Sequence, residues 1–196
     1  MTRTTANAVL NQRLRELLQP GAGQLMPGAG NALTARIIEA TGHQMLMVSG
    51  AAVANSNLGA PDIGLTSLPE LASHVGAIRD AVNLPLLVDA DTGFGNPINV
   101  HHTVRVLERA GANAIMLEDQ EFPKRCGHFE GKSVISTAEM VQKIKAAVDA
   151  REDERLMILA RTDARAVEGL QAALGRARGY REAGGGFLFV GAPLGV

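Results

Sequence analysis

Short apolar runs alternate along this chain with longer stretches in which apolar residues recur at helical spacing. The apolar runs predict six strands, at Gln24–Met26, Met45–Val48, Leu84–Val88, Ala114–Leu117, Leu156–Ala160 and Phe187–Val190. The periodic stretches predict helices at Asn7–Leu18, Ala32–Thr41, Leu68–Val82, Ile98–Ala110, Thr137–Ala150 and Val167–Ala183. Because the strands are apolar throughout and alternate with helices, the pattern predicts an α/β fold with a parallel sheet covered by helices.

Helix-ending and helix-starting residues support these boundaries. Gly42, Gly111 and Gly184 each follow a periodic stretch, where glycine commonly ends a helix. Ser136, followed by Glu139, predicts a capping box at the start of another helix. No linker or low-complexity segment interrupts the pattern, so residues 1–196 are expected to form a single domain.

Chemically useful side chains follow most of the predicted strands. Ser49 follows the second strand, Asp89 and Asp91 the third, Glu118 the fourth and Arg161 the fifth. An open doubly wound sheet takes its site only from the strands at its switch point, whereas a (β/α)8 barrel takes it from consecutive strand ends. We therefore expect a fold of the (β/α)8 TIM-barrel type that is incomplete, with about six of the eight strand–helix units.

Composition and charge argue against several classes of function for this chain. The chain has 196 residues, with 19 Lys and Arg against 20 Asp and Glu and a net charge of −1. This balance argues against nucleic acid or an anionic membrane surface as the partner, and no apolar run approaches the roughly 20 residues of a membrane-spanning helix. The single Cys excludes an internal disulfide and fits a reducing compartment, so we expect a cytoplasmic protein.

The segment Val88–Gly95, Val-Asp-Ala-Asp-Thr-Gly-Phe-Gly, is the strongest chemical signal. If Asp89 and Asp91 are both extended, their carboxylates leave the same face and repel each other unless a cation lies between them. Hard oxygen ligands favour Mg²⁺, and Glu118 at the end of the next strand could supply a third carboxylate. The alternative is that these are solvated acids in a glycine-containing turn.

A second signal is Lys124-Arg125-Cys126-Gly127-His128, within a connection that runs from Asp119 to about Ser136. Strand-to-helix connections usually have about 2–6 residues, and longer ones often act as lids. Two cations and an imidazole near the only thiol favour Cys126 as a proton donor or nucleophile. The alternative is an exposed Cys in a basic loop, and a zinc site is disfavoured because there is no second Cys.

Small residues and an arginine add weaker signals. The backbone N–H groups of Ser49-Gly50-Ala51, directly after a strand, could approach an anionic substrate closely. Arg161 could clamp a substrate carboxylate in a bidentate way, or form an ion pair with Asp163 or Glu118. Asp62 follows a proline and by pattern alone is typical of a turn.

Seven motifs occur in a fixed order between about Met26 and Val190: Pro27-Gly28-Ala29, Val48-Ser49-Gly50, Pro61-Asp62-Ile63-Gly64, Asp89-Ala90-Asp91-Thr92-Gly93-Phe94-Gly95, Glu118-Asp119-Gln120, Lys124-Arg125-Cys126-Gly127-His128 and Ala160-Arg161-Thr162-Asp163-Ala164. Together they resemble the isocitrate lyase / phosphoenolpyruvate mutase superfamily. Within it the chain is most similar to the 2-methylisocitrate lyases, with the carboxyphosphonoenolpyruvate mutases as neighbours.

The resemblance implies a (β/α)8 barrel, usually a homotetramer, with Mg²⁺ as cofactor and a small-molecule carboxylate as substrate. The residues expected to hold Mg²⁺, partly through water, are Asp89, Asp91 and Glu118. Those expected to contact the substrate are Ser49, Gly50, Ala51, Arg161 and Asp62, of which Asp62 also orients the metal shell. Those expected in a catalytic gating loop are Lys124, Arg125, Cys126 and His128, with Cys126 as the general acid.

The activity implied by the resemblance is Mg²⁺-dependent cleavage of a carbon–carbon bond in a 2-hydroxy tricarboxylate such as 2-methylisocitrate, which releases pyruvate and succinate. Cys126 favours a lyase over a decarboxylase. The alternatives are a carboxyphosphonoenolpyruvate or phosphoenolpyruvate mutase, an oxaloacetate decarboxylase on the same scaffold, and an inactive truncated fragment.

The sequence departs from the superfamily pattern in two places. Relatives commonly have Glu at the end of the sixth strand, where this chain has Gly191. The sequence stops at Val196, so we expect a truncated barrel without strands seven and eight, which exposes two sheet edges. The alternative is that a partner chain completes the barrel.

Overall fold

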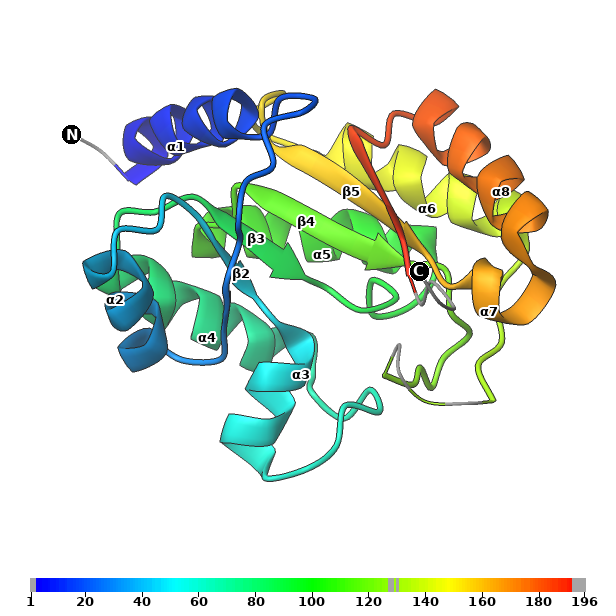
Figure 1. The fold of residues 1–196 in the computed structure, drawn as a ribbon, viewed down its shortest axis with the longest axis horizontal. Coiled ribbons are helices and arrows are strands. Elements are labelled where there is room, and N and C mark those ends of the chain that lie inside the picture. Colours follow the sequence, from blue (N-terminus) through cyan, green and yellow to red (C-terminus); the bar gives the residue numbers. More distant parts are fainter. Residues whose placement is uncertain (1–2, 127–128, 130, 192–196) are drawn as a thin grey trace.

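Six parallel strands form one sheet in the order in which they occur along the chain (Figure 1). The computed structural model describes residues 3–126, 129 and 131–191. The strands are β1 (Gly28–Ala29), β2 (Leu46–Val48), β3 (Leu86–Asp89), β4 (Ala114–Glu118), β5 (Met157–Thr162) and β6 (Phe187–Val190). Each strand pairs in parallel with its sequence neighbours, and within the described residues β1 and β6 form the two edges. This sequential parallel order is that of consecutive units of a (β/α)8 barrel.

Helices cover one face of the sheet and one of its ends (Figure 1). Those along the face are α2 (Ala32–Ala40), α4 (Leu68–Ala81), α5 (Pro97–Ala110), α6 (Thr137–Ala150) and α8 (Leu170–Glu182), and α1 (Arg3–Leu17) lies across the end where the strands begin. Two short helices, α3 (Gly50–Val53) and α7 (Ala164–Glu168), follow β2 and β5. In the described part of the chain, no helix combines the length and the apolar character needed to cross a membrane.

Most predicted elements are confirmed within a few residues, and the exceptions have local causes. The first strand was expected at Gln24–Met26 but lies at Gly28–Ala29, because its pairing with β2 begins at the carbonyl of Pro27. The last predicted helix is divided into α7 and α8 at Gly169, whose φ of 89° interrupts the helical path. A π-helical turn over Ala54–Leu58, which extends α3, was not predicted.

Successive side chains of a strand point to opposite faces of the sheet. Those on one face pack against the helices in an outer core, and those on the other face form an inner cluster. In β4, Ile115 and Leu117 pack in the core with the helices, and Ala114 and Met116 pack in the inner cluster. Leu14 of α1 also belongs to the inner cluster, so this helix closes the end where the strands begin. The inner face is therefore apolar near α1, and its polar side chains follow at the other end of the strands.

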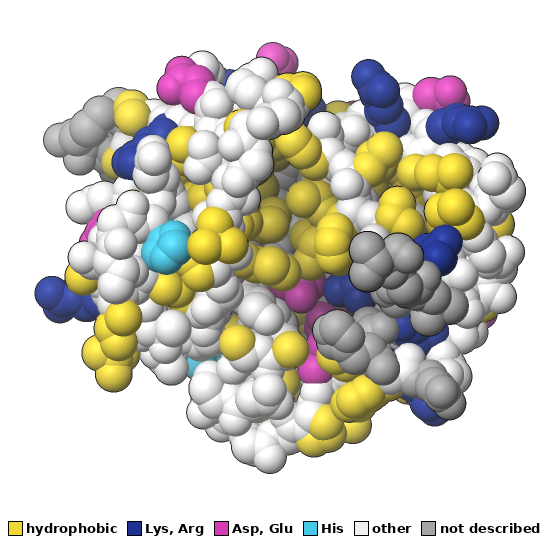
Figure 2. Space-filling model, in the orientation of Figure 1, with side chains coloured by type: hydrophobic (Ala, Val, Ile, Leu, Met, Phe, Trp, Pro, Cys, Tyr) yellow, Lys and Arg dark blue, Asp and Glu magenta, His cyan; other side chains and the backbone are white. Residues whose placement is uncertain are grey.

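The inner face of the sheet lines a hollow in the described chain (Figure 2). Apolar side chains cover the middle of the hollow, and acidic and basic side chains gather at one edge of it. On the edge strand β6, Leu188 and Phe189 are exposed. The candidate site therefore lies at the charged edge of this hollow.

Candidate active site at the carboxyl ends of the strands

Three charged side chains stand at the ends of neighbouring strands. Asp89 is the last residue of β3, Glu118 is the last residue of β4, and Arg161 lies next to the last residue of β5. The strand register places Glu118 directly opposite Arg161. Because parallel strands end at the same edge of a sheet, these side chains gather there, as the sequence predicts.

The turn after β3 has an uncommon backbone that brings the two aspartates together. Asp91 has a φ of 50° and Phe94 one of 60°, left-handed values that are uncommon for residues with a side chain. The N–H of Asp91 donates to Oδ1 of Asp89 (3.2 Å), and its carbonyl accepts from the N–H of Glu118 (2.8 Å). The condition that both aspartates are extended is therefore not met, because the chain has already turned at Asp91.

Glu118 carries a buried carboxylate that accepts no hydrogen bond within the described residues. The residue is 1% exposed, and both of its side-chain oxygens lack a hydrogen-bond donor. Nη1 of Arg161 lies 3.4 Å from Oε2, and Nζ of Lys124 lies 4.0 Å from Oε1. An ionised carboxylate that is buried without hydrogen bonds costs free energy, so a further cation here would stabilise the ionised form of Glu118.

The ammonium group of Lys124 lies among the carboxylates. Its side chain is 2% exposed, and Nζ is 2.7 Å from Oδ2 of Asp62 and 2.9 Å from Oδ1 of Asp91. Asp62 thus belongs to the cluster, although by pattern alone it is typical of a turn. The structure brings together residues that lie in three separate sequence motifs.

Burial changes the protonation of this cluster. Burial, reinforced by the charge of Asp89, raises the pKa of Asp91 to about 7. Burial also raises the pKa of Glu118 to about 8, against the attraction of Arg161 and Lys124. For Lys124 burial favours the neutral amine, but the surrounding carboxylates, Asp91 foremost, outweigh it and raise the pKa. An added positive charge would favour the ionised form of both acids.

The segment after β2 lies against the same carboxylates. A Cβ on Gly50 would lie 3.2 Å from Oδ1 of Asp91 and 3.3 Å from Oδ2 of Asp89, so glycine allows the backbone to approach closely. The N–H of Gly50 donates to Asp89 (3.4 Å), and the N–H of Ser49 donates to a carbonyl of β1 (3.2 Å). That Ser49, Gly50 and Ala51 contact a substrate stays a prediction.

Arg161 forms the ion pairs that the sequence left open as an alternative to substrate binding. Its guanidinium lies 3.4 Å from Glu118, 3.1 Å from Asp163, and 5.6 Å from the ring centroid of Phe189. A Cβ on Gly191 would lie 2.6 Å from Oδ1 of Asp163, so the absence of a side chain there leaves room for this carboxylate. Contact between Arg161 and a substrate stays a prediction.

The loop after β4, whose Lys124 enters the carboxylate cluster, also bears Cys126 as a free thiol. Cys126 is half-buried, whereas the neighbouring Arg125 is exposed. Gly127 and His128 lie outside the described residues, so the catalytic role expected for His128 remains a prediction. The roles of Cys126, Lys124 and Arg125 in a reaction are likewise predictions that their positions allow.

The donor atoms suit a magnesium ion that is bound partly through water. In the residues that the structure describes, no three His, Cys, Asp or Glu side chains are grouped so that they could hold a metal ion. Both side-chain oxygens of Glu118 are nevertheless buried without a hydrogen bond, and Oδ1 of Asp91, 2.9 Å from the ammonium of Lys124, lies in the same cluster. Mg²⁺ commonly takes one or two carboxylates and keeps several waters, which fits these oxygens better than a cage of three direct ligands.

Sequence reasoning did not identify the residues that support the turn after β3. The hydroxyl of Thr103 donates to the carbonyl of Gly93 (3.0 Å), and the ammonium of Lys143 donates to the carbonyl of Thr92 (3.2 Å). Both donors are buried. The sequence does contain a sign of these contacts: Thr103 and Lys143 are polar residues on the apolar faces of their predicted helices. A polar group in such a position needs a buried hydrogen-bond partner.

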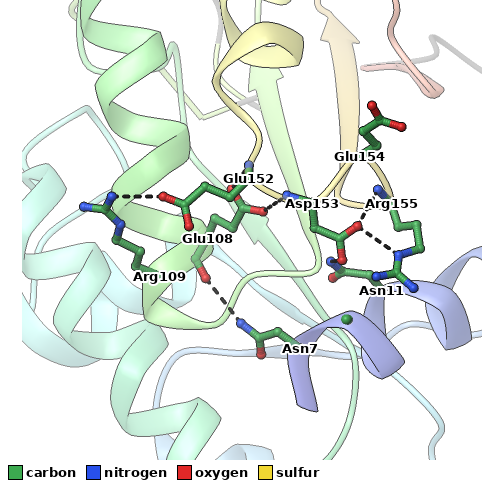
Figure 3. A pocket seen from close by; sticks show the side chains of 9 residues that line it. Asn7, Asn11, Glu108, Arg109, Glu152, Asp153, Glu154 and Arg155 are labelled. Carbon is green, nitrogen blue, oxygen red and sulfur yellow. Dashed lines mark hydrogen bonds and ion pairs between the residues drawn. The ribbon is translucent and has the colours of Figure 1, made fainter. Parts of the chain in front are cut away.

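A separate cavity of about 600 Å³ lies at the opposite end of the sheet (Figure 3). It is lined by α1, the end of α5 and the loop before β5. Its charged side chains pair with one another: Arg109 donates to Glu152 (2.9 Å) and Arg155 to Asp153 (2.9 Å). Because the amino ends of barrel strands generally serve stability, we assign this cavity to the docking of α1.

Comparisons with known proteins agree with the fold and the motifs. A family described as phosphoenolpyruvate phosphomutase matches residues 14–194. The 2-methylisocitrate lyase of Shewanella oneidensis is 48% identical over 177 residues, which are 90% of this chain and 61% of that enzyme.

Two solved structures superpose closely. A trigonal crystal form of 2,3-dimethylmalate lyase, a PEP mutase/isocitrate lyase superfamily member, gives a TM-score of 0.89 at 33% identity and covers 97% of this chain and 63% of that one. Phosphonopyruvate hydrolase in complex with oxalate and Mg²⁺ gives a TM-score of 0.84 at 34% identity, with the same coverage. The predicted barrel-type fold is confirmed, and the chain spans 61–63% of the length of these three proteins.

Proposed function

The chain belongs to the phosphoenolpyruvate phosphomutase family within the isocitrate lyase / PEP mutase superfamily, as its motifs predicted, and from this premise we propose that it is a Mg²⁺-dependent carbon–carbon lyase. The proposed substrate is a 2-hydroxy tricarboxylate such as 2-methylisocitrate, and the products are pyruvate and succinate. The observation that carries the proposal is the buried carboxylate cluster at the strand ends, beside a loop that bears Cys126.

Asp91 and Glu118 are the residues proposed to hold Mg²⁺, with Asp89 next to them and water completing the shell. When bound, Mg²⁺ would act as a Lewis acid on the oxygens of the half that becomes pyruvate. Lys124 neutralises part of the negative charge, since its ammonium contacts Asp62 and Asp91.

The remaining steps belong to the protein's own side chains. Arg161 would bind a substrate carboxylate, for which its fork of N–H donors is suited. As the carbon–carbon bond breaks, the substrate hydroxyl would pass its proton to an ionised carboxylate of the cluster and become the carbonyl of pyruvate, and the bonding electrons would pass to the carbon of the succinate half. The thiol of Cys126 would protonate that carbon, while the loop excludes water from the hollow.

The experiment that tests the proposal measures pyruvate released from 2-methylisocitrate by this chain with and without Mg²⁺. We expect release only with Mg²⁺, and we expect Cys126→Ser to lower the rate by about 10²- to 10⁴-fold. A folded chain that binds Mg²⁺ but releases no pyruvate would show that the lyase proposal is wrong.

A mutase or decarboxylase is a second candidate, because the matching family is described as a phosphomutase and a similar structure is a phosphonopyruvate hydrolase. These reactions do not require protonation of a succinate carbanion. Full activity of Cys126→Ser on phosphonopyruvate or oxaloacetate, with none on 2-methylisocitrate, would favour this candidate over the lyase.

A further inference from the structure

The long loop after β4 is closed at its base by backbone pairing. The N–H of Glu121 donates to the carbonyl of Ser133 (3.0 Å), and the N–H of Ile135 donates to the carbonyl of Asp119 (2.9 Å). Gln120 pairs with Val134 in the same antiparallel ladder. The base of the loop is therefore held by main-chain hydrogen bonds, which do not depend on the identity of any side chain.

In the described part of the segment beyond this base, the amide of Gln120 holds the backbone of Arg125. Its Oε1 accepts from the N–H of Arg125 (3.0 Å), and its Nε2 donates to the carbonyl of Arg125 (2.9 Å). Both backbone groups of Arg125 are thus satisfied by a single amide, as they would be by a neighbouring strand. Gln120 is 1% exposed, so the loss of these bonds would leave buried polar groups without partners.

The same amide also connects the loop to the end of β5. Nε2 of Gln120 donates to Oδ2 of Asp163 (3.0 Å), an oxygen that also lies 3.1 Å from Nη2 of Arg161. Asp163 is fully buried, and its own N–H donates to Asp119. One carboxylate therefore fixes both Gln120 and Arg161.

We propose that Gln120 is a positioning residue: its amide holds the Lys124–Cys126 segment against the carboxylate cluster and couples that segment to Arg161 through Asp163. Arg125 lies between Lys124 and Cys126 in the sequence. Fixing its backbone therefore orients the ammonium of Lys124 on one side and the thiol of Cys126 on the other. The catalytic consequence rests on the proposed function, but the positioning itself does not.

The test compares tryptic cleavage after Lys124 and Arg125 in the wild-type chain and in Gln120→Met, which keeps the length of the side chain but cannot form these bonds. We expect cleavage at these two sites to rise at least about fivefold, because the segment opens locally while the base stays paired. Labelling of the Cys126 thiol should accelerate by a similar factor. Gln142→Met, at an exposed position of α6, is the matched control and should leave both rates unchanged.

A rescue separates positioning from a general loss of stability. Gln120→Glu should also release the segment, since its carboxylate faces that of Asp163. The double variant Gln120→Glu with Asp163→Asn exchanges amide and carboxylate between the two positions and should restore slow cleavage at least in part. Wild-type cleavage rates in a folded Gln120→Met, equal acceleration at every tryptic site, or no rescue by the double variant would each overturn the proposal. None of these outcomes depends on pyruvate release, which tests the proposed function separately.

Discussion

Glu118 shows at the scale of one residue how burial couples stability to pH. Its folded-state pKa is about 8 against an ordinary value of 4.5, because burial disfavours the carboxylate. Between these pH values the folded chain binds more protons than the unfolded chain. The free energy of unfolding should therefore fall as pH rises through this window, and Asp91, with a pKa of about 7, contributes with the same sign.

The variant Glu118→Gln should weaken this pH dependence in the metal-free protein. A neutral amide does not ionise, so we expect the free energy of unfolding of the variant to exceed that of wild type by about 1 kcal/mol at about pH 8.5. At about pH 6 this difference between variant and wild type should be smaller. Urea unfolding at the two pH values in the presence of EDTA measures the effect. Glu182→Gln, at an exposed position, is the control. If the free energy of unfolding of Glu118→Gln falls with pH as steeply as that of wild type, Glu118 is not the group that causes the pH dependence.

Lys124 is the buried cation on which the ionised cluster depends. The variant Lys124→Met leaves Asp62 and Asp91 without this partner, and breaking a buried ion pair typically costs about 3–5 kcal/mol. We expect a loss of this order in urea unfolding, partly recovered when Mg²⁺ is added. Lys145→Met on the exposed face of α6 should change stability little. Equal stability of Lys124→Met and Lys145→Met would show that the ammonium of Lys124 does not stabilise the carboxylate cluster.

At the scale of elements, α8 is fastened to the base of the long loop through one buried acid. Asp119 accepts from the hydroxyl of Tyr180 (2.7 Å), from that of Thr162 (2.7 Å) and from Arg176 (3.4 Å). Burial, together with the charge of Asp119, raises the pKa of Tyr180, which keeps this hydroxyl a donor. The helix, the loop base and the end of β5 therefore meet at a single carboxylate.

Removing the hydroxyl in Tyr180→Phe should destabilise the fold by about 1–2 kcal/mol without affecting the carboxylate cluster. Thermal unfolding measures the first effect. Titration with Mg²⁺, followed by the shift of the thermal midpoint, measures the second. A change of Mg²⁺ affinity as large as the change of stability would show that α8 acts on the site directly.

The elements that sequence reasoning placed best are those with a strong periodic pattern. Thr137–Ala150 and Phe187–Val190 have the predicted bounds, because a long amphipathic face and a dense apolar run leave little choice. The two-residue strand β1 has no such pattern, since its pairing with β2 alone defines it. The division of α7 from α8 depends on one backbone angle at Gly169.

At the scale of the whole molecule, Mg²⁺ should stabilise the folded chain, because the ligands proposed for it converge only in the folded state. A ligand at about 100 times its dissociation constant contributes about 2.7 kcal/mol. We expect the thermal midpoint to rise with added Mg²⁺, to return with EDTA, and to respond much less in Asp91→Asn. If saturating Mg²⁺ leaves the wild-type midpoint unchanged, the metal site is not where we propose it.

The sequence by itself determined the alternation of strands and helices, the parallel barrel-type sheet and the motifs that identify the superfamily. These follow from local periodicity and from residue types, which need no knowledge of neighbours in space. Only the tertiary structure decided that Lys124 enters the carboxylate cluster, that Arg161 pairs with both Glu118 and Asp163, and that Gln120 holds the loop. Such contacts join residues from different strands and loops, and their geometry depends on how the chain packs once the strand ends meet at one edge.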